Sequence, residues 1–393
     1  MSRHGDLVGR RINTHHLTAR PRQRSGDLAI TRPDIEHSTN PFEFTYDQRN
    51  DLILVLGISP IGESIDPPAS VFLPESSRQV IRHAGHTTVD GMQFSVWPNI
   101  KYPVDEVLEL ARWLDDGRWL GMWFADHYMP NTGTTEVNDG DSHEVWGLLP
   151  AVAVVTERLR LGPLVSPTSV HHPAVLANRA ATIDHVSKGR FVLGLGAGWQ
   201  INEHHAYGIE LEEPKARVDR FDEAIQIIRS LLDNPRTTFD GSVFTITDAP
   251  CEPKPIQDRL PLLVGTGGNR MLKITARHAD EWNTWGHPDG AGERLAAMRA
   301  ACETVGRDPA TLHTSVQVAI HLSDDDAANA KVLAGPLGAR TLAGGAEQLI
   351  DTLHRYVDLG FDEFIVPDWL MGPSHHGRME HLDRLHAEVI SKL

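Results

Sequence analysis

Strand-like and helix-like segments alternate regularly from Met92 to the end of the chain. The expected strands are short apolar runs, and the segments between them carry apolar residues at the spacing of an amphipathic helix. Eight expected strands span Gln93–Trp97, Met122–Ala125, Leu159–Val165, Arg190–Leu195, Leu260–Val264, Glu281–Trp285, Leu312–Leu322 and Glu363–Val366. Eight strand–helix pairs in about 300 residues predict an α/β chain folded as a (β/α)₈ TIM barrel.

An open, doubly wound sheet is the alternative fold for such an alternation. That fold normally places a Gly-rich phosphate-binding turn after its first strand. The corresponding turn here, residues 98–103, contains no glycine.

One further element, a hairpin over Thr237–Ile246, is expected to turn at Asp240-Gly241.

Residues 1–91 differ in kind from residues 92–393. The first segment has ten arginines and no lysine, whereas all nine tryptophans lie at Trp97 or later. It shows no sustained period of 2 or 3.6, so we expect a mostly disordered N-terminal extension before the barrel domain. A small docking domain is the alternative. A further hypothesis makes Met92 the native start, which peptides mapped from residues 30–90 in the source organism would contradict.

Charge and composition exclude several classes of function. The formal net charge of −16 should repel nucleic acid and anionic membranes. No apolar run is long enough to span a bilayer, and residues 1–24 are too polar and Arg-rich for a signal peptide. The two cysteines, Cys251 and Cys302, form no disulfide framework or metal knuckle. We therefore expect a cytoplasmic protein.

Chemistry in a barrel of this kind is located in the loops that follow the strands. Asp126 and His127 follow the second expected strand, where a histidine can transfer protons near neutral pH. The alternative is that Asp126 caps a turn and His127 packs beneath the loop. Ser166 begins a hydroxyl-rich stretch after the third strand that could hydrogen-bond a planar heterocycle.

Two Gly-rich segments could approach a cofactor. Gly194, Gly196 and Gly198 lack the spacing of a dinucleotide fingerprint, and either admit a flat ligand to the backbone or pack a tight barrel corner. Val264–Arg270 runs directly into a helix, whose free N–H groups together with an arginine favour a phosphate. A capped turn is the alternative there.

A metal centre is not expected. The chain has 22 histidines, and some are adjacent, as in His171-His172, His204-His205 and His375-His376. Adjacent residues on a strand point to opposite faces and cannot share an ion. The pair of histidines separated by one residue that opens metal-dependent barrel hydrolases does not occur.

Taken together, the motifs resemble the bacterial luciferase-like superfamily of oxidoreductases, and most of all its F420-dependent branch. The matching stretches cover nearly all of residues 92–370 and include Met122-Trp-Phe-Ala-Asp-His127, His172-Pro-Ala-Val-Leu-Ala177, Ser187–Trp199, Leu262–Gly268, Ala279-Asp-Glu-Trp-Asn283 and Leu359–Phe364. Residues 1–91 have no counterpart in that family.

The resemblance implies a cofactor site and a reacting side chain. A cis peptide bond at Leu164-Val165 would support the cofactor ring, and His127 would stand beside the reacting carbon. The remaining cofactor contacts implied are Asp126 and Ser166 to the ring, Asn202 from the strand-four loop, and Gly267, Gly268 and Arg270 to the phosphate. The resemblance also implies a homodimer. Trp199 departs from the glutamate of the sugar-phosphate dehydrogenases, which argues against a sugar-phosphate substrate.

The expected function is F420-dependent hydride transfer to or from a small organic substrate, with His127 exchanging the accompanying proton. One alternative is an FMN-dependent monooxygenase that uses O₂ and receives reduced flavin from a partner reductase. Another is a flavin-binding protein without turnover. An apolar substrate pocket could be lined by Trp97, Trp199, Trp282 and Trp285.

Overall fold

The computed structural model describes residues 42–46, 52–56 and 91–393. The chain divides into two compact units, Met1–Arg78 and Gln79–Leu393. Within the first unit, β1 (Phe42–Tyr46) pairs antiparallel with β2 (Leu52–Leu56). The other residues of the expected N-terminal extension lie outside the described ranges, so its disorder stays a prediction.

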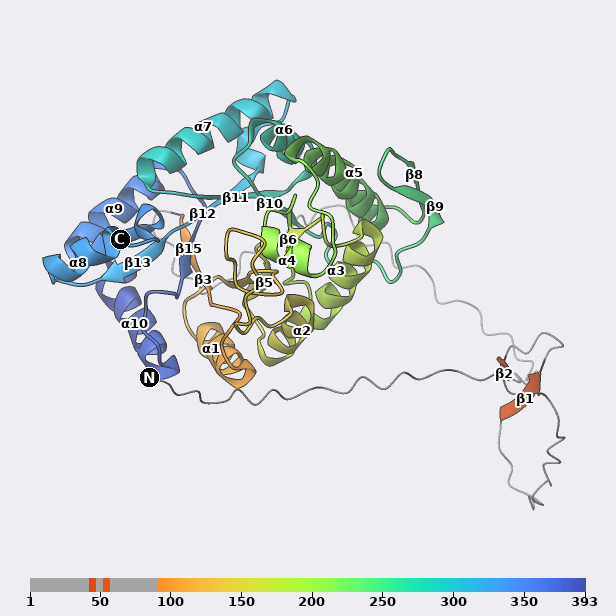
Figure 1. Cartoon of the computed structure of the whole chain (residues 1–393), viewed down its shortest axis with the longest axis horizontal. Helices are drawn as coiled ribbons and strands as arrows, with labels where there is room; N and C mark the ends of the chain where they lie inside the picture. The colour runs from red at the N-terminus through yellow and green to blue at the C-terminus, as the bar shows by residue number, and fades with distance from the viewer. Residues whose placement is uncertain (1–41, 47–51, 57–90) are drawn as a thin grey trace, which may run out of the picture. The chain divides into compact units, whose positions relative to one another are not determined.

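The second unit is built on a parallel sheet that forms the predicted (β/α)₈ barrel (Figure 1). Its strand order is β5-β4-β3-β15-β12-β11-β10-β7-β6, and β5 and β6 are two halves of one barrel strand interrupted at Leu164 and Val165. The strands are β3 (Gln93–Trp97), β4 (Gly121–Phe124), β5 (Arg160–Pro163), β6 (Ser166–Pro167), β7 (Leu193–Gly196), β10 (Leu262–Gly265), β11 (Glu281–Trp285), β12 (His313–Gln317) and β15 (Glu363–Pro367).

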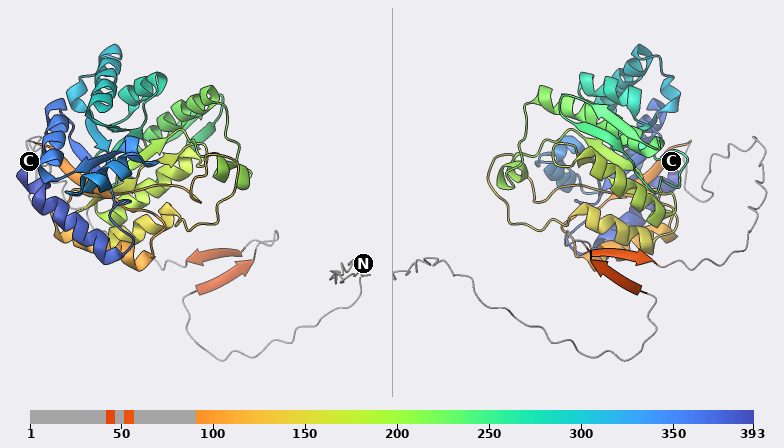
Figure 2. Two further views of the ribbon diagram at one scale, coloured as in Figure 1. Left: turned by 60° about the vertical axis from the view of Figure 1, so that its left-hand side comes forward. Right: turned by 90° about the vertical axis from the view of Figure 1, so that its right-hand side faces the viewer.

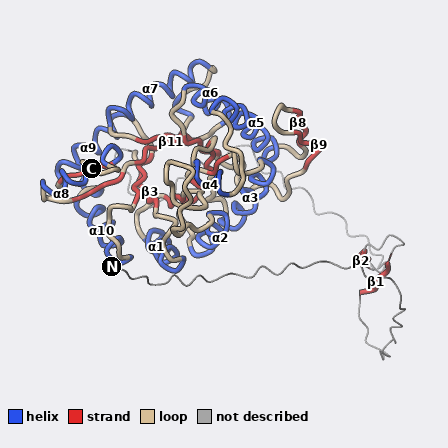
Figure 3. Tube along the Cα trace, viewed as in Figure 1, coloured by secondary structure: helices blue, strands red, loops and turns tan. Residues whose placement is uncertain are grey.

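Helices lie outside the strands on all sides of the barrel (Figures 2 and 3). They are α1 (Val104–Asp116), α2 (Val145–Val155), α3 (Pro173–Ser187), α5 (Pro214–Asp233), α6 (Asn269–His278), α7 (Pro288–Thr304), α9 (Ala346–Leu359) and α10 (His375–Glu388). In α1 the buried residues Val107, Leu110, Ala111 and Leu114 recur at the spacing of one helix face, which packs toward the sheet. None of the described helices is long and apolar enough to cross a membrane.

Alternate residues of the barrel strands belong to two separate apolar clusters. One cluster, between strands and helices, includes Phe94, Val96, Met122 and Phe124. The other fills the barrel interior and consists of Trp97, Trp123, Leu164, Val192, Leu263 and Ile365. This two-residue period follows from the alternation of side chains across a strand and makes the barrel a packed core rather than a pore.

One part of the fold differs from the sequence-based expectation. The run Leu312–Leu322 was expected as one strand, but it divides into β12 and β13 (Ala319–Leu322). β13 pairs with β14 (Thr341–Gly344) in a small sheet of its own, beside α8 (Asp326–Leu333). The single-strand prediction was wrong because apolar residues recur on both sides of the break and no Gly or Pro marks it. The expected hairpin is confirmed as β8 (Thr237–Asp240) and β9 (Thr245–Ala249).

Candidate active site

Asp126 lies just beyond β4 and is the centre of a buried hydrogen-bond cluster. Its Oδ2 accepts hydrogen bonds from Ser166 Oγ at 2.5 Å, His171 Nε2 at 2.8 Å and Trp146 Nε1 at 3.1 Å. Burial alone would raise the pKa of Asp126, but the hydrogen bond and charge of His171, with the bonds from Ser166 and Trp146, hold that pKa below its usual value. Asp126 and Ser166 thus lie together, bonded to each other. Their contact with a cofactor ring stays a prediction.

His127 is held by a carboxylate that the sequence did not predict. Its Nδ1 lies 2.9 Å from Glu203 Oε1, and its backbone carbonyl accepts a hydrogen bond from Ser142 Oγ at 2.7 Å. The side chain of Glu203 is 2% exposed and that of His127 is 21% exposed. No described residue hydrogen-bonds His127 Nε2. The ring is therefore fixed at one nitrogen and free at the other, rather than packed beneath the loop.

The peptide bond between Leu164 and Val165 is cis, as the resemblance implies. The Val165 side chain lies against the glycines at the ends of β7 and β10. A Cβ built on Gly196 would lie 2.7 Å from Val165 Cγ2, and one built on Gly194 would lie 1.9 Å from the Pro163 carbonyl oxygen. Of the two interpretations of these glycines, the tightly packed barrel corner is therefore the one that fits.

The loop after β7 leads into a short helix, α4 (Ile201–Ala206), which was not expected from the sequence. Two of its side chains hold the loop that follows β4. Gln200 Nε2 donates to the Met129 carbonyl at 2.8 Å, and Asn202 Nδ2 donates to the Pro130 carbonyl at 2.9 Å. The Oδ1 atom of Asn202 is buried and has no hydrogen-bond partner among the described residues. That acceptor can bind a donor on a ligand, which keeps the predicted role of Asn202 open.

The amino terminus of α6 follows the Gly-rich segment that was predicted to bind an anion. Gly268 is its N-cap and forms no side-chain cap, and a Cβ built on Gly268 would meet nothing within 4 Å. The first-turn N–H groups are therefore accessible to an anion. Arg270 pairs with Asp219, and Arg294 lies 3.9 Å from the position of a Cβ on Gly267. The geometry places Gly267, Gly268 and Arg270 together; their role as a phosphate site stays a prediction.

Three tryptophans form a cluster at the carboxyl ends of β3, β11 and β15. The Trp97 ring lies 5.4 Å from Trp285 and 4.9 Å from Trp369, and the Arg340 guanidinium lies 4.9 Å over Trp285. This cluster packs on the barrel interior. Trp282 does not join it, because that side chain is buried between sheet and helices and donates to the Thr266 carbonyl at 2.9 Å.

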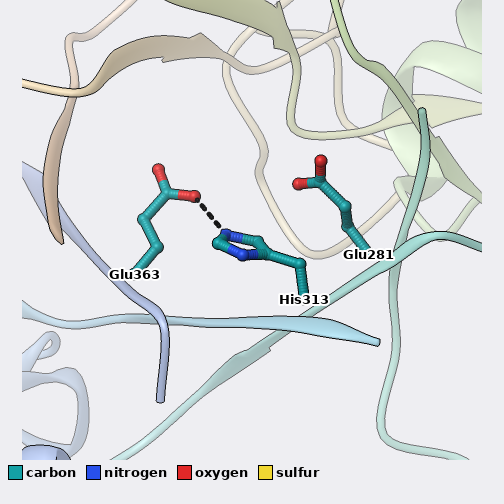
Figure 4. Close-up of side chains that lie close together, drawn as sticks. All are labelled: Glu281, His313 and Glu363. Carbon is teal, nitrogen blue, oxygen red and sulfur yellow. Dashed lines mark hydrogen bonds and ion pairs between the residues drawn. The ribbon is translucent and has the colours of Figure 1, made fainter. Parts of the chain in front are cut away.

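A charged cluster closes the opposite, amino-terminal end of the barrel strands. Glu281, His313 and Glu363 place ligand-type atoms within 4.8 Å of one another (Figure 4). The guanidinium of Arg160 bonds Glu281 and lies 3.7 Å from Glu363. Arg160 and protonated His313 balance the charges of the two carboxylates, so ion pairing among these side chains accounts for the cluster.

The acidic and basic side chains of this network stabilise one another in their charged forms. Burial alone would lower the pKa of His313, but Glu281 and Glu363 hold it above its usual value. Burial alone would raise the pKa of Glu363, but His313 and Arg160 hold it below its usual value. The network is therefore an internal set of ion pairs at the floor of the barrel.

Sequence patterns missed several residues of the site. Glu203 follows the predicted Asn202, but no helical turn was expected there, so its direction toward the β4 loop could not be foreseen. His171 had been considered only as half of an adjacent histidine pair. Trp146 and Trp369 were not singled out, because no motif in their segments marks them as site residues. The residue types could be read from the sequence, but the contacts that bring these side chains to the site join residues far apart in the chain.

Comparison with known proteins matches most of the barrel unit to one protein family. A family model described as luciferase-like monooxygenase matches residues 82–337. The expectation that none of residues 1–91 has a counterpart in the family was therefore wrong for residues 82–91. The chain is 30% identical over 210 residues to an F420-dependent glucose-6-phosphate dehydrogenase of Kineococcus radiotolerans, covering 52% of this chain and 60% of that protein. It is 29% identical over 234 residues to an F420-dependent hydroxymycolic acid dehydrogenase of Mycobacterium tuberculosis, covering 58% and 62%. The match thus spans about three fifths of each relative.

Solved structures share the architecture at low identity. An F420-dependent tetrahydromethanopterin reductase from Methanopyrus kandleri superposes with a TM-score of 0.64 at 17% identity, covering 77% of this chain and 99% of that one. A long-chain alkane monooxygenase superposes with a TM-score of 0.64 at 15% identity, covering 78% and 92%. These likenesses establish the TIM-barrel fold.

Proposed function

The chain belongs to the luciferase-like monooxygenase family, and from that premise we propose that it is an oxidoreductase dependent on the deazaflavin F420. When bound, the deazaflavin supplies a carbon, C5, that exchanges a hydride with a small organic substrate. The relatives named above as F420-dependent support this cofactor. The observation that carries the proposal is His127 at the barrel mouth, with Nδ1 tied to Glu203 and Nε2 free to exchange a proton.

The residues at the mouth fit the cofactor. The open amino terminus of α6, with Gly267 and Gly268, suits a phosphate because its N–H groups and helix dipole favour an anion. The buried, unpartnered Oδ1 of Asn202 suits a donor on a heterocycle. Arg270 would turn from Asp219 toward the phosphate, since both are exposed enough to rearrange.

We propose that the substrate is an apolar alcohol or ketone rather than a sugar phosphate. Trp199 meets His127 edge-on, with ring centroids 5.5 Å apart, and is 56% exposed. Ile201 and Tyr207, from the same loop and helix, are 41% and 55% exposed. Exposed apolar side chains grouped beside a reacting group are typical of a ligand site.

We also propose a cytoplasmic homodimer. The exposed valines Val154 of α2 and Val175 of α3, at 73% and 47% exposure, support an apolar contact between subunits on this side of the barrel. Both cysteines are buried and unpaired, which supports a reducing compartment. Sedimentation equilibrium of the wild type and of Val154→Glu tests the dimer: a monomeric wild type contradicts it.

Equilibrium binding of F420 and of FMN to the purified full chain tests the cofactor assignment. We expect tight binding of F420 and weak binding of FMN. Preference for FMN would move the protein to the monooxygenase alternative, in which a partner reductase supplies reduced flavin. Binding without any substrate-dependent change in the cofactor spectrum would instead favour the flavin-binding role without turnover.

A further inference from the structure

The helix α4 holds the β4 loop through three side chains that reach three successive residues. Gln200 and Asn202 bond the carbonyls of Met129 and Pro130, as described above. Glu203 Oε2 accepts from the Tyr128 backbone N–H at 2.8 Å. Three separate hydrogen bonds therefore hold the backbone of this loop. Glu203 differs from the other two residues because its second oxygen, Oε1, also contacts the His127 side chain.

The chemistry of a buried carboxylate decides which nitrogen of His127 carries a proton. An ionised carboxylate can only accept hydrogen bonds. Glu203 Oε1, 2.9 Å from His127 Nδ1, thus requires an N–H at Nδ1 in both the neutral and the cationic ring. In the neutral ring this leaves the lone pair at Nε2, the nitrogen that no described residue hydrogen-bonds.

We propose that Glu203 is a positioning residue that fixes His127 in the Nδ1–H tautomer and so makes Nε2 the atom that exchanges a proton with the substrate. The inference rests on the proposed function for the identity of the substrate, whereas the tautomer can be measured without it. The buried negative charge of Glu203 also stabilises the imidazolium once Nε2 has taken a proton.

The proton then moves between the substrate oxygen and His127 Nε2, in opposite directions for oxidation and reduction. In oxidation, the O–H bond of a bound hydroxyl breaks and its proton forms an N–H bond at Nε2. The electron pair of that O–H bond forms the second C–O bond, and the C–H bond breaks as its hydride passes to the oxidised deazaflavin of the proposed function. In reduction, a hydride from the reduced deazaflavin forms the C–H bond, the second C–O bond breaks toward oxygen, and that oxygen takes the proton from Nε2 as the Nε2–H bond breaks. The Nδ1–H bond to Glu203 persists throughout, so the ring keeps its orientation.

Nitrogen-15 NMR of histidine-labelled full-length protein without cofactor tests the tautomer, with the His127 signal identified by its loss in His127→Asn. We expect the Nδ1–H tautomer in the wild type. In Glu203→Gln, an amide oxygen still accepts from Tyr128 while the NH₂ group faces Nδ1, so the proton should move to Nε2. Ser142→Ala is the control, because it removes a bond to the His127 backbone only and should leave the tautomer unchanged.

Measurements of kcat and of F420 affinity distinguish a role of Glu203 in orienting His127 from a role in holding the loop. We expect Glu203→Gln to lower kcat about 100-fold while F420 affinity stays within about twofold of wild type. A Glu203→Gln protein that keeps both the Nδ1–H tautomer and the wild-type kcat would overturn the proposal. An Nε2–H tautomer in the wild type would overturn it even if the variant did not fold. Absence of F420 binding would contradict the proposed function and leave the tautomer result standing.

Discussion

Gly196 approaches Val165 so closely that a Cβ on Gly196 would lie 2.7 Å from Val165 Cγ2. The Val165 side chain also lies 3.2 Å from the position of a Cβ on Gly265. Glycines at the ends of β7 and β10 thus make room for one side chain of the interrupted barrel strand. Val165 belongs to the segment predicted to support the cofactor ring. It can occupy this position because the neighbouring glycines have no side chains.

Gly196→Ala should displace Val165 and weaken cofactor binding. Overpacking of this kind costs about 1–3 kcal/mol, so we expect a lower melting temperature and F420 affinity reduced by about tenfold or more. Gly290→Ala in α7 is the matched control, since a Cβ on Gly290 meets nothing within 4 Å. Equal F420 affinity in the two variants would show that the Val165 position does not matter for binding.

Trp199→Glu should shift substrate preference away from apolar alcohols. Trp199 is 56% exposed, so its replacement removes apolar contact beside His127 with little effect on folding. We expect kcat/KM for an apolar secondary alcohol to fall about tenfold or more, as measured by steady-state reduction of F420. Leu333→Glu, an exposed apolar side chain of α8, is the control. An unchanged kcat/KM for apolar substrates would contradict the proposed substrate class.

Asp368→Asn should change how stability depends on pH. Burial raises the pKa of Asp368 to about 7, despite nearby Arg378. Because the folded pKa lies above the unfolded value of about 4, the stability due to this group is full below pH ~4 and is lost as pH rises through ~7.

The neutral asparagine should therefore gain stability relative to wild type, by up to a few kcal/mol, between those pH values. Urea unfolding at a series of pH values measures the difference, with exposed Asp139→Asn as control. A stability difference between Asp368→Asn and wild type that does not vary with pH would contradict the buried, protonatable carboxyl.

Arg160→Met should destabilise the barrel floor. It would leave Glu281 and Glu363 buried with only His313 as a cationic partner, a change that typically costs about 3–5 kcal/mol. The control is Arg236→Met, whose pair with Asp248 is exposed and should be worth less than about 1 kcal/mol. Denaturant unfolding that ranks the two variants equally would show that the network is not a structural unit.

Much of the barrel could be predicted because its strands are short, apolar and locally marked. The expected ranges of β3 and β11 match the structure residue for residue. The break between β12 and β13 was missed because apolar residues continue across it and no Gly or Pro separates the two segments. Whether β13 joins the barrel or a second sheet depends on its pairing with β14, a contact across about 20 residues that no short pattern encodes.

The candidate site was predictable only in part. His127 was singled out because a histidine after a barrel strand is a recognisable signal, and the cis bond at Leu164-Val165 was implied by the family resemblance. The Glu203–His127 contact joins residues 76 positions apart. It depends on the direction of a six-residue helix, which periodicity cannot specify. Likewise, the engagement of Arg270 with Asp219 became visible only in three dimensions.

The most direct test of the central claim is anaerobic, single-turnover mixing of the F420-loaded protein with apolar secondary alcohols while the cofactor absorbance is followed. We expect loss of the oxidised deazaflavin band on mixing, slowed strongly in His127→Asn at unchanged F420 affinity. No absorbance change with any alcohol or, for the reduced cofactor, any ketone, together with O₂-dependent product formation from reduced FMN, would contradict it.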